Sequence, residues 1–75
     1  MKKDEFINTI KEALQRDGEL TEDMVLAELE EWDSLAALSI IAIFDKYFSI
    51  KYKYNDISKL YNIGDLIKLA NGKLE

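Results

Sequence analysis

The stretch DSLAALSIIAIFDKYF, residues 33–48, decides the fold that we expect. After Ser34 its apolar run is interrupted only by Ser39 before the charged end, so a helix from Ser34 to about Phe48 carries apolar groups on all sides. Asp33 stands where an N-cap residue accepts hydrogen bonds from the first free backbone N–H groups. A phosphate ester on the Ser34 hydroxyl would face the positive end of the helix dipole. Ser34 is therefore a candidate attachment point.

The residues before this stretch predict a first helix and then a long loop. Apolar side chains recur at helical spacing, after acidic residues and before a basic one: Phe6, Ile7, Ile10, Ala13 and Leu14, with Asp4, Glu5 and Arg16. Asp17 and Gly18 are expected to stop this helix, because glycine readily adopts the left-handed conformation. Over residues 19–32 the spacing loosens, and we expect an ordered loop with one helical turn around residues 22–26.

The residues after the stretch predict a loop and a short helix. Residues 49–54 alternate like a strand, but one isolated strand has nothing to pair with, so a connecting loop is expected. Residues 55–60 fit a helix of one or two turns, with Asn55 or Asp56 as its cap. The side chains expected to point inward from it are Ile57 and Leu60.

Asn62, three residues before Asp65, resembles the N-cap of a last helix. The apolar residues of that helix are Ile63, Leu66, Ile67, Leu69 and Ala70, and Asn71 with Gly72 would end it. The chain is thus predicted to be all-α, a small four-helix bundle of three longer helices and one short one, with a long loop between helices one and two. A chain of 75 residues can build only one core, so residues 1–75 are expected to form a single domain.

Composition excludes several classes of function. The net charge of -5 disfavours binding to nucleic acid and to anionic membrane surfaces. The absence of cysteine excludes a disulfide framework, a thiolate nucleophile and a cysteine-ligated metal. The longest apolar run, residues 35–44, is about half of the roughly 20 residues that span a bilayer, and no signal-peptide pattern opens the chain. We therefore expect a cytoplasmic monomer without membrane insertion.

The apolar helix is either buried all round or shared between the core and a binding surface. One stripe suits the interior and consists of Ile40, Ile41, Phe44 and Phe48. Leu35, Leu38 and Ala42 lie nearer the opposite side, and we predict that they face a partner. The alternative is that all of these side chains belong to the core and that other residues supply the solubility.

An acidic cluster surrounds the start of the helix: Glu28, Glu30, Glu31 and Asp33. Its spacing does not match a calcium-binding loop, and a small bundle can hardly enclose the cleft that two catalytic carboxylates need. We expect a solvated face that steers partners, with no metal and no catalytic residues. Tyr52 and Tyr54 alternate with Lys51 and Lys53 as in a nucleic-acid stacking surface, but the negative net charge favours aromatic caps on the core.

Asp33, Ser34 and Leu35, with the long acidic loop before them and the apolar helix after them, resemble the attachment motif of the acyl carrier protein family. The resemblance covers essentially the whole chain. In that family the serine of this motif carries 4'-phosphopantetheine, derived from coenzyme A, which supplies the thiol that a chain without cysteine lacks. The resemblance implies attachment at Ser34, with Asp33 as the helix cap and Leu35 beside it.

The same resemblance implies a carrier that catalyses nothing itself. It would deliver acyl or aminoacyl thioesters in fatty acid, polyketide or related biosynthesis. Its partners would be a phosphopantetheinyl transferase and acyl-activating, synthase or acyltransferase enzymes, which would dock on Glu30, Glu31, Leu35, Leu38 and Ala42. A core that could part to shelter a chain would be lined by Ile40, Phe44, Phe48, Ile57, Leu60 and Ile67.

Several residues depart from the fatty-acid type of the family. Family members commonly carry acidic residues early in the second helix, where this chain has Ala36, Ala37 and Ser39. Lys51 and Lys53 stand where the family is commonly acidic, and Trp32 resembles specialised carriers such as the D-alanyl and peptidyl types. A specialised carrier, an unmodified helical adaptor and a small acid–base or metal-assisted enzyme are the alternatives.

Overall fold

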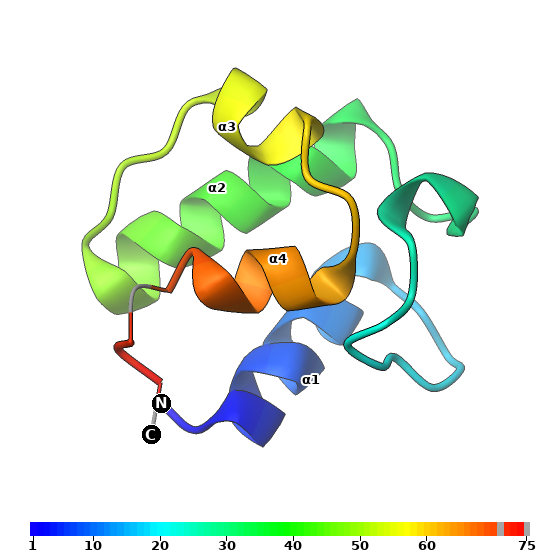
Figure 1. Cartoon of the computed structure of the whole chain (residues 1–75), viewed down its shortest axis with the longest axis horizontal. Helices are drawn as coiled ribbons and strands as arrows, with labels where there is room; N and C mark the ends of the chain where they lie inside the picture. Colours follow the sequence, from blue (N-terminus) through cyan, green and yellow to red (C-terminus); the bar gives the residue numbers. More distant parts are fainter. Residues whose placement is uncertain (71, 75) are drawn as a thin grey trace.

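Helix α2 (Ser34–Phe48) is the longest element, and the other helices pack around it (Figure 1). The computed structural model describes residues 1–70 and 72–74. The other elements are α1 (Lys3–Leu14), the 3-10 turn η1 (Leu26–Glu28), α3 (Tyr54–Ser58) and α4 (Ile63–Lys68). In these residues there is no strand, and one isolated bridge joins Val25 to Asn62. The predicted all-α fold with a long loop between the first two helices is confirmed.

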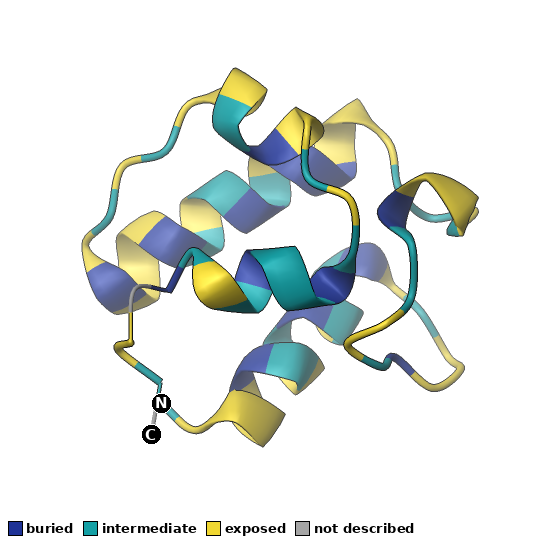
Figure 2. Cartoon of the chain, viewed as in Figure 1, coloured by how far each residue is buried: buried dark blue, intermediate teal, exposed yellow. Residues whose placement is uncertain are grey.

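Three phenylalanine rings form the centre of the core. Phe6 of α1 lies with its ring centroid 5.6 Å from that of Phe44 and 5.5 Å from that of Phe48, both on α2. The ring of Tyr52 meets Phe44 edge-on at 5.2 Å, and its hydroxyl donates to the backbone oxygen of Leu69 at 2.6 Å. Tilted and edge-on ring pairs of this kind add stabilisation beyond the burial of their area. Buried residues lie along the inner faces of the helices (Figure 2).

The bounds of α2 agree with the prediction at both ends, whereas α4 is shorter than expected. Asn62 caps α4 by accepting from the backbone N–H of Asp65 at 2.9 Å, as predicted. After Lys68 the backbone hydrogen bonds change from four-residue to three-residue spacing, since the Ala70 N–H donates to the Ile67 oxygen at 3.1 Å. Within the described part of the chain, the bundle therefore has two long and two short helices, instead of the predicted three longer ones and one short one. Gly72 is left-handed, with φ of 74°, and Asn71 lies outside the described residues.

Two predicted helix ends are wrong. Helix α1 does not run on to Asp17 and Gly18, because Gln15 already adopts the left-handed conformation, with φ of 57°. The following backbone N–H, of Arg16, donates to the oxygen of Lys11, and this closes the helix end.

Helix α3 begins at Tyr54, one residue earlier than expected, and its N-cap position is occupied by Lys53. Neither Asn55 nor Asp56 is the N-cap. Asp56 instead caps from inside the helix, since its carboxylate accepts from the backbone N–H of Lys53 at 2.9 Å. Ile57 is fully buried and Leu60 is half-buried against the core, which confirms the prediction that both side chains point inward.

The loop between α1 and α2 is fixed to the first residues of α4 and to the segment just before it. Leu26 donates its backbone N–H to the oxygen of Tyr61 at 2.9 Å, and Gly64 donates to the oxygen of Glu22 at 2.8 Å. A Cβ atom at Gly64 would approach that Glu22 oxygen to 3.3 Å, so a larger residue would push the two backbones apart. The helical turn of the loop lies over Leu26–Glu28, slightly later than predicted. The loop therefore forms part of the fold.

Among the described residues, no helix combines the length and the apolar character that crossing a membrane requires.

Candidate functional site

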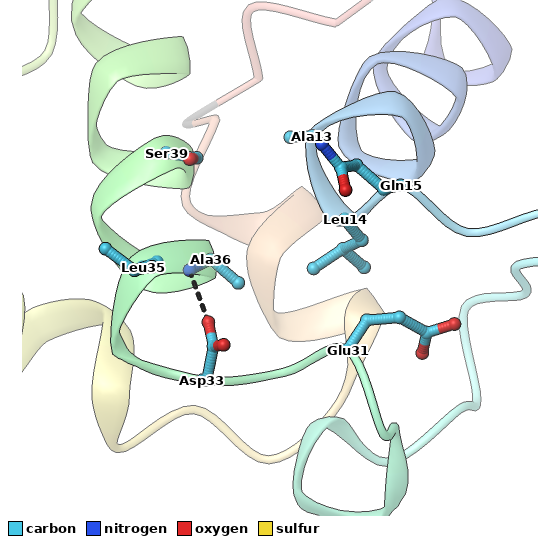
Figure 3. Close-up of a pocket in the computed structure, with 8 residues that line it drawn as sticks. All are labelled: Ala13, Leu14, Gln15, Glu31, Asp33, Leu35, Ala36 and Ser39. Atoms are coloured by element: carbon cyan, nitrogen blue, oxygen red, sulfur yellow. Dashed lines mark hydrogen bonds between the residues drawn. The ribbon is translucent and has the colours of Figure 1, made fainter.

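Ser34 is the first residue of α2 and is exposed. The predicted N-cap is confirmed, because the Asp33 carboxylate accepts from the backbone N–H of Ala36 at 2.8 Å (Figure 3). The Asp33 backbone oxygen also accepts from the N–H of Ala37 at 3.0 Å. These bonds fix the backbone on both sides of Ser34 while its hydroxyl stays on the surface. The hydroxyl is thus within reach of a modifying enzyme.

Tyr54 contacts the Ser34 hydroxyl, which the sequence reasoning did not anticipate. The two side-chain oxygens lie 3.2 Å apart, and either can be the donor. We expected Tyr52 and Tyr54 to cap the core together. Tyr52 does so, whereas Tyr54 is 41% exposed and leans toward the start of α2. No local pattern signals this contact, because it depends on how α3 packs against α2.

The predicted partner-facing residues form an exposed stripe on α2. Leu35 is 74% exposed, Leu38 is 52% exposed and Ala42 is also exposed. Their spacing of three and four residues places them on one side of the helix. The alternative that all apolar residues of α2 belong to the core is wrong for these three. Their binding to a partner remains a prediction.

The opposite side of α2 contributes more of the core than predicted. Ile40, Phe44 and Phe48 are buried as expected, and Ile41 is half-buried. Ala36 and Ala37 are buried as well, although they stand where the family commonly carries acidic residues, which would favour exposure. The helical spacing from Ala36 to Ile40 and Phe44 is the signal that could have found their burial.

A pocket of about 250 Å³ lies between the end of α1 and the first turns of α2 (Figure 3). Buried Leu14 and Ala36 are among its apolar lining, and its polar lining comprises Gln15, Glu31, Asp33 and Ser39. Ala13 of α1 faces Ser39 of α2 across the pocket in this view. A pocket with this mixed lining suits a small group that has both apolar and hydrogen-bonding atoms.

The four residues of the acidic cluster, Glu28, Glu30, Glu31 and Asp33, differ in their surroundings. Glu31 is half-buried and accepts from Arg16 Nη1 at 3.1 and 3.2 Å, so part of its role is to join the loop to the end of α1. Glu28, Glu30 and Asp33 are exposed, as a solvated face requires. Within residues 1–70 and 72–74, no group of three or more acidic, histidine or cysteine side chains is arranged to hold a metal ion.

Comparisons with protein-family models, with curated proteins and with solved structures found no match for this chain. The link to acyl carrier proteins therefore rests on the sequence motif and on the surroundings of Ser34. The serine follows the capping residue and is exposed, an exposed apolar stripe runs along the same helix, and exposed acidic residues precede it in the chain. Chemically, an exposed serine hydroxyl can be esterified, and exposed leucine side chains can make apolar contacts.

Proposed function

We propose that this protein is a carrier whose Ser34 hydroxyl receives a 4'-phosphopantetheine arm. The observation that carries the proposal is the exposed serine directly after a working N-cap, beside the exposed Leu35. The N-terminus of a helix as long as α2 favours a negative group, and a phosphodiester at Ser34 would lie there. When bound, the arm supplies the thiol on which acyl or aminoacyl groups are carried as thioesters.

The attachment reaction is a phosphoryl-type transfer from coenzyme A. The Ser34 oxygen attacks the phosphorus next to the pantetheine unit, and a new P–O bond forms. The P–O bond to the second phosphate breaks, so adenosine 3',5'-bisphosphate leaves. The proton of the serine hydroxyl passes to a base on the transferase. Asp33 contributes by fixing the backbone at Ser34, since its carboxylate is bonded to the Ala36 N–H.

The surface around Ser34 supports docking of partner enzymes. Leu35, Leu38 and Ala42 offer a dry contact, and burying exposed leucines is worth about 25 cal/mol per Å² of apolar area. Glu28 and Glu30 are exposed and would steer a partner with a basic patch. We propose that the transferase and the acyl-activating, synthase or acyltransferase partners share this face.

The interior favours a short or polar cargo. Phe6, Phe44 and Phe48 fill the centre of the core with ring centroids 5.5 to 5.8 Å apart, and moving them would sacrifice close packing. The pocket near the start of α2, at about 250 Å³, falls below the roughly 300–1,000 Å³ typical of ligand pockets. This favours a specialised carrier, of the aminoacyl or short-acyl kind, over a carrier that shelters a long chain.

Intact mass spectrometry tests the proposal. The protein is incubated with coenzyme A and a broad-specificity phosphopantetheinyl transferase, alongside Ser34→Ala and Ser49→Ala. Ser49 is a matched control, because it is an exposed serine at the other end of α2. We expect the wild type and Ser49→Ala to gain one phosphopantetheine and Ser34→Ala to gain none. A gain that persists in Ser34→Ala would identify a different residue as the attachment site.

The exposed stripe on α2 also favours a second candidate, an unmodified helical adaptor that binds a protein through Leu35 and Leu38. This candidate predicts no mass gain with several transferases. It also predicts that Ser34→Ala retains partner binding, while Leu35→Glu abolishes it.

A further inference from the structure

We propose that Tyr54 is a positioning residue for the group carried on Ser34. In the unmodified chain its phenol hydrogen-bonds to the serine hydroxyl, and after attachment it donates instead to an oxygen of the phosphodiester. The inference rests on the proposed function. It assigns to α3 a part in presenting the arm that no sequence motif indicates.

The contact joins two elements that are fixed independently. Ser34 is held by the cap at the start of α2, and Tyr54 is the first residue of α3, which is anchored by fully buried Ile57. The two side-chain oxygens are 3.2 Å apart although the residues are 20 positions apart in sequence. The close approach is therefore set by the packing of α3 on α2 and does not depend on a flexible connection.

The chemistry of attachment changes what the serine oxygen offers. As a hydroxyl it can donate and accept, but as an ester oxygen it has no proton to donate. The phosphodiester adds non-bridging oxygens that carry the negative charge and are two bonds away from that position. Hydrogen bonds to charged oxygens are shorter and stronger than those to neutral ones. A phenol already placed against Ser34 would therefore transfer its bond to the phosphate.

Tyr54 has the freedom that such a transfer needs. Its side chain is 41% exposed, so a small rotation moves its hydroxyl without opening the core. Tyr52, two residues earlier, differs because its hydroxyl is bonded to the Leu69 oxygen at 2.6 Å and its ring packs on Phe44. Of these two neighbouring tyrosines, Tyr52 is fixed in the fold and Tyr54 is placed to respond to the state of Ser34.

Two effects of Tyr54→Phe follow, one on the attachment reaction and one on the stability of the modified protein. The substitution removes a bond that competes with the transferase for the serine hydroxyl, so the attachment rate should stay equal or rise by up to about threefold. It also removes the bond to the phosphate in the modified protein. We expect attachment to raise the melting temperature of the wild type by about 4 °C, and the gain to fall by more than half in Tyr54→Phe.

The control variant is Tyr61→Phe. Tyr61 is 65% exposed, and within the described residues its hydroxyl makes no hydrogen bond. The proteins carry tyrosine labelled with ¹³C at the Cζ atom, and Tyr54→Phe identifies the Tyr54 signal. In the unmodified protein, Ser34→Ala should shift the Tyr54 signal and leave that of Tyr61 in place. After attachment, the ³¹P signal of the diester should differ between the wild type and Tyr54→Phe but not between the wild type and Tyr61→Phe.

The outcomes separate this inference from the proposed function. If no transferase modifies Ser34, both are overturned. If Ser34 is modified but Tyr54→Phe matches Tyr61→Phe in melting temperature and in the ³¹P signal, the carrier function stands and the role of Tyr54 is wrong. An unmoved Tyr54 signal in unmodified Ser34→Ala would overturn the role of Tyr54 without any modification step.

Discussion

The segment before α2 and the segment after it are both anchored to the core, yet they carry opposite charge. Every charged residue over 17–33 is acidic. Over 49–60 the charged residues are three lysines and one aspartate: Lys51, Lys53, Lys59 and Asp56. Both segments reach Ser34, since Asp33 precedes it in the chain and the hydroxyl of Tyr54 lies 3.2 Å from its own.

The two segments are anchored by different means. The acidic segment contains only the short turn η1 and is fixed by buried Leu20 and Leu26 and by backbone bonds to residues 61–64. The basic segment is fixed by buried Ile57 and by the ring of Tyr52. In both, a few apolar residues set the position of the backbone. The charges are thereby left on the surface, where they can be used for recognition.

The largest expected effect tests whether the buried residue of the acidic segment contributes as much to the stability of the fold as that of the basic segment. Leu26 is 1% exposed and Ile57 is fully buried. Leu26→Ala and Ile57→Ala should each lower the free energy of unfolding by about 3 kcal/mol, because each leaves a cavity in the core. Urea unfolding measures both. A loss below about 0.5 kcal/mol for Leu26→Ala would mean that the loop connects α1 to α2 without contributing to the stability of the core.

The caps of the two segments should differ in strength. Asp33 caps α2 from outside the helix, whereas Asp56 caps α3 from within. Asp33→Ala should cost about 1 kcal/mol of stability and Asp56→Ala about half of that, because α3 has a single turn to lose. Thermal unfolding compares the two variants. Asp33→Asn is the control, since an asparagine oxygen still accepts the Ala36 N–H, and its stability should stay near that of the wild type.

The charge difference predicts a smaller, kinetic effect. Replacing Glu28 and Glu30 together by glutamine should slow attachment by a transferase with a basic surface by about threefold at low salt. Replacing Lys51 and Lys53 together by glutamine should leave the rate equal or raise it. The differences should vanish at high salt, where charges are screened. Equal slowing by both pairs of substitutions would contradict a steering role for the acidic segment.

The smallest expected effect concerns the ion pair between α1 and the acidic segment. Lys3 Nζ lies 2.7 Å from a carboxylate oxygen of Glu22, and this hydrogen bond, with the charge of Glu22, raises the pKa of Lys3 above its ordinary value of 10.5. The pair contributes fully below pH 10.5, and the contribution is lost as the pH rises through the raised pKa of the folded state.

Melting temperatures of the wild type and Lys3→Gln, compared over alkaline pH, measure this contribution. The two curves should converge as the pH rises. Both side chains are exposed to solvent, so the difference at neutral pH should be small. A difference that grows with pH would contradict the assigned direction of the pKa shift.

The parts of the fold that local patterns control could be predicted from the sequence. The bounds of α2, its Asp33 cap and the Asn62 cap of α4 follow from residue types at fixed spacing, and each is confirmed. The exposure of Leu35 and Leu38 also followed from their position on the helix.

The remaining features depend on tertiary packing. Gln15, a residue without special preference for the left-handed conformation, ends α1 in place of Gly18. Alanine is common on both the buried and the exposed side of a helix. The packing of neighbouring elements therefore decides that Ala36 and Ala37 are buried. The contact of Tyr54 with Ser34 requires two separate elements to be placed correctly, and a linear pattern does not contain that information.

The exposed stripe on α2 has a practical consequence for engineering. Leu35, Leu38 and Ala42 project outward while the cap, the aromatic centre and the backbone pairings lie elsewhere. Surface substitutions away from such features usually change stability by less than about 0.5 kcal/mol. The side chains at these three positions can thus be replaced by those of another helical protein without loss of the fold. A library of variants at these positions could then be screened for binding to new protein partners.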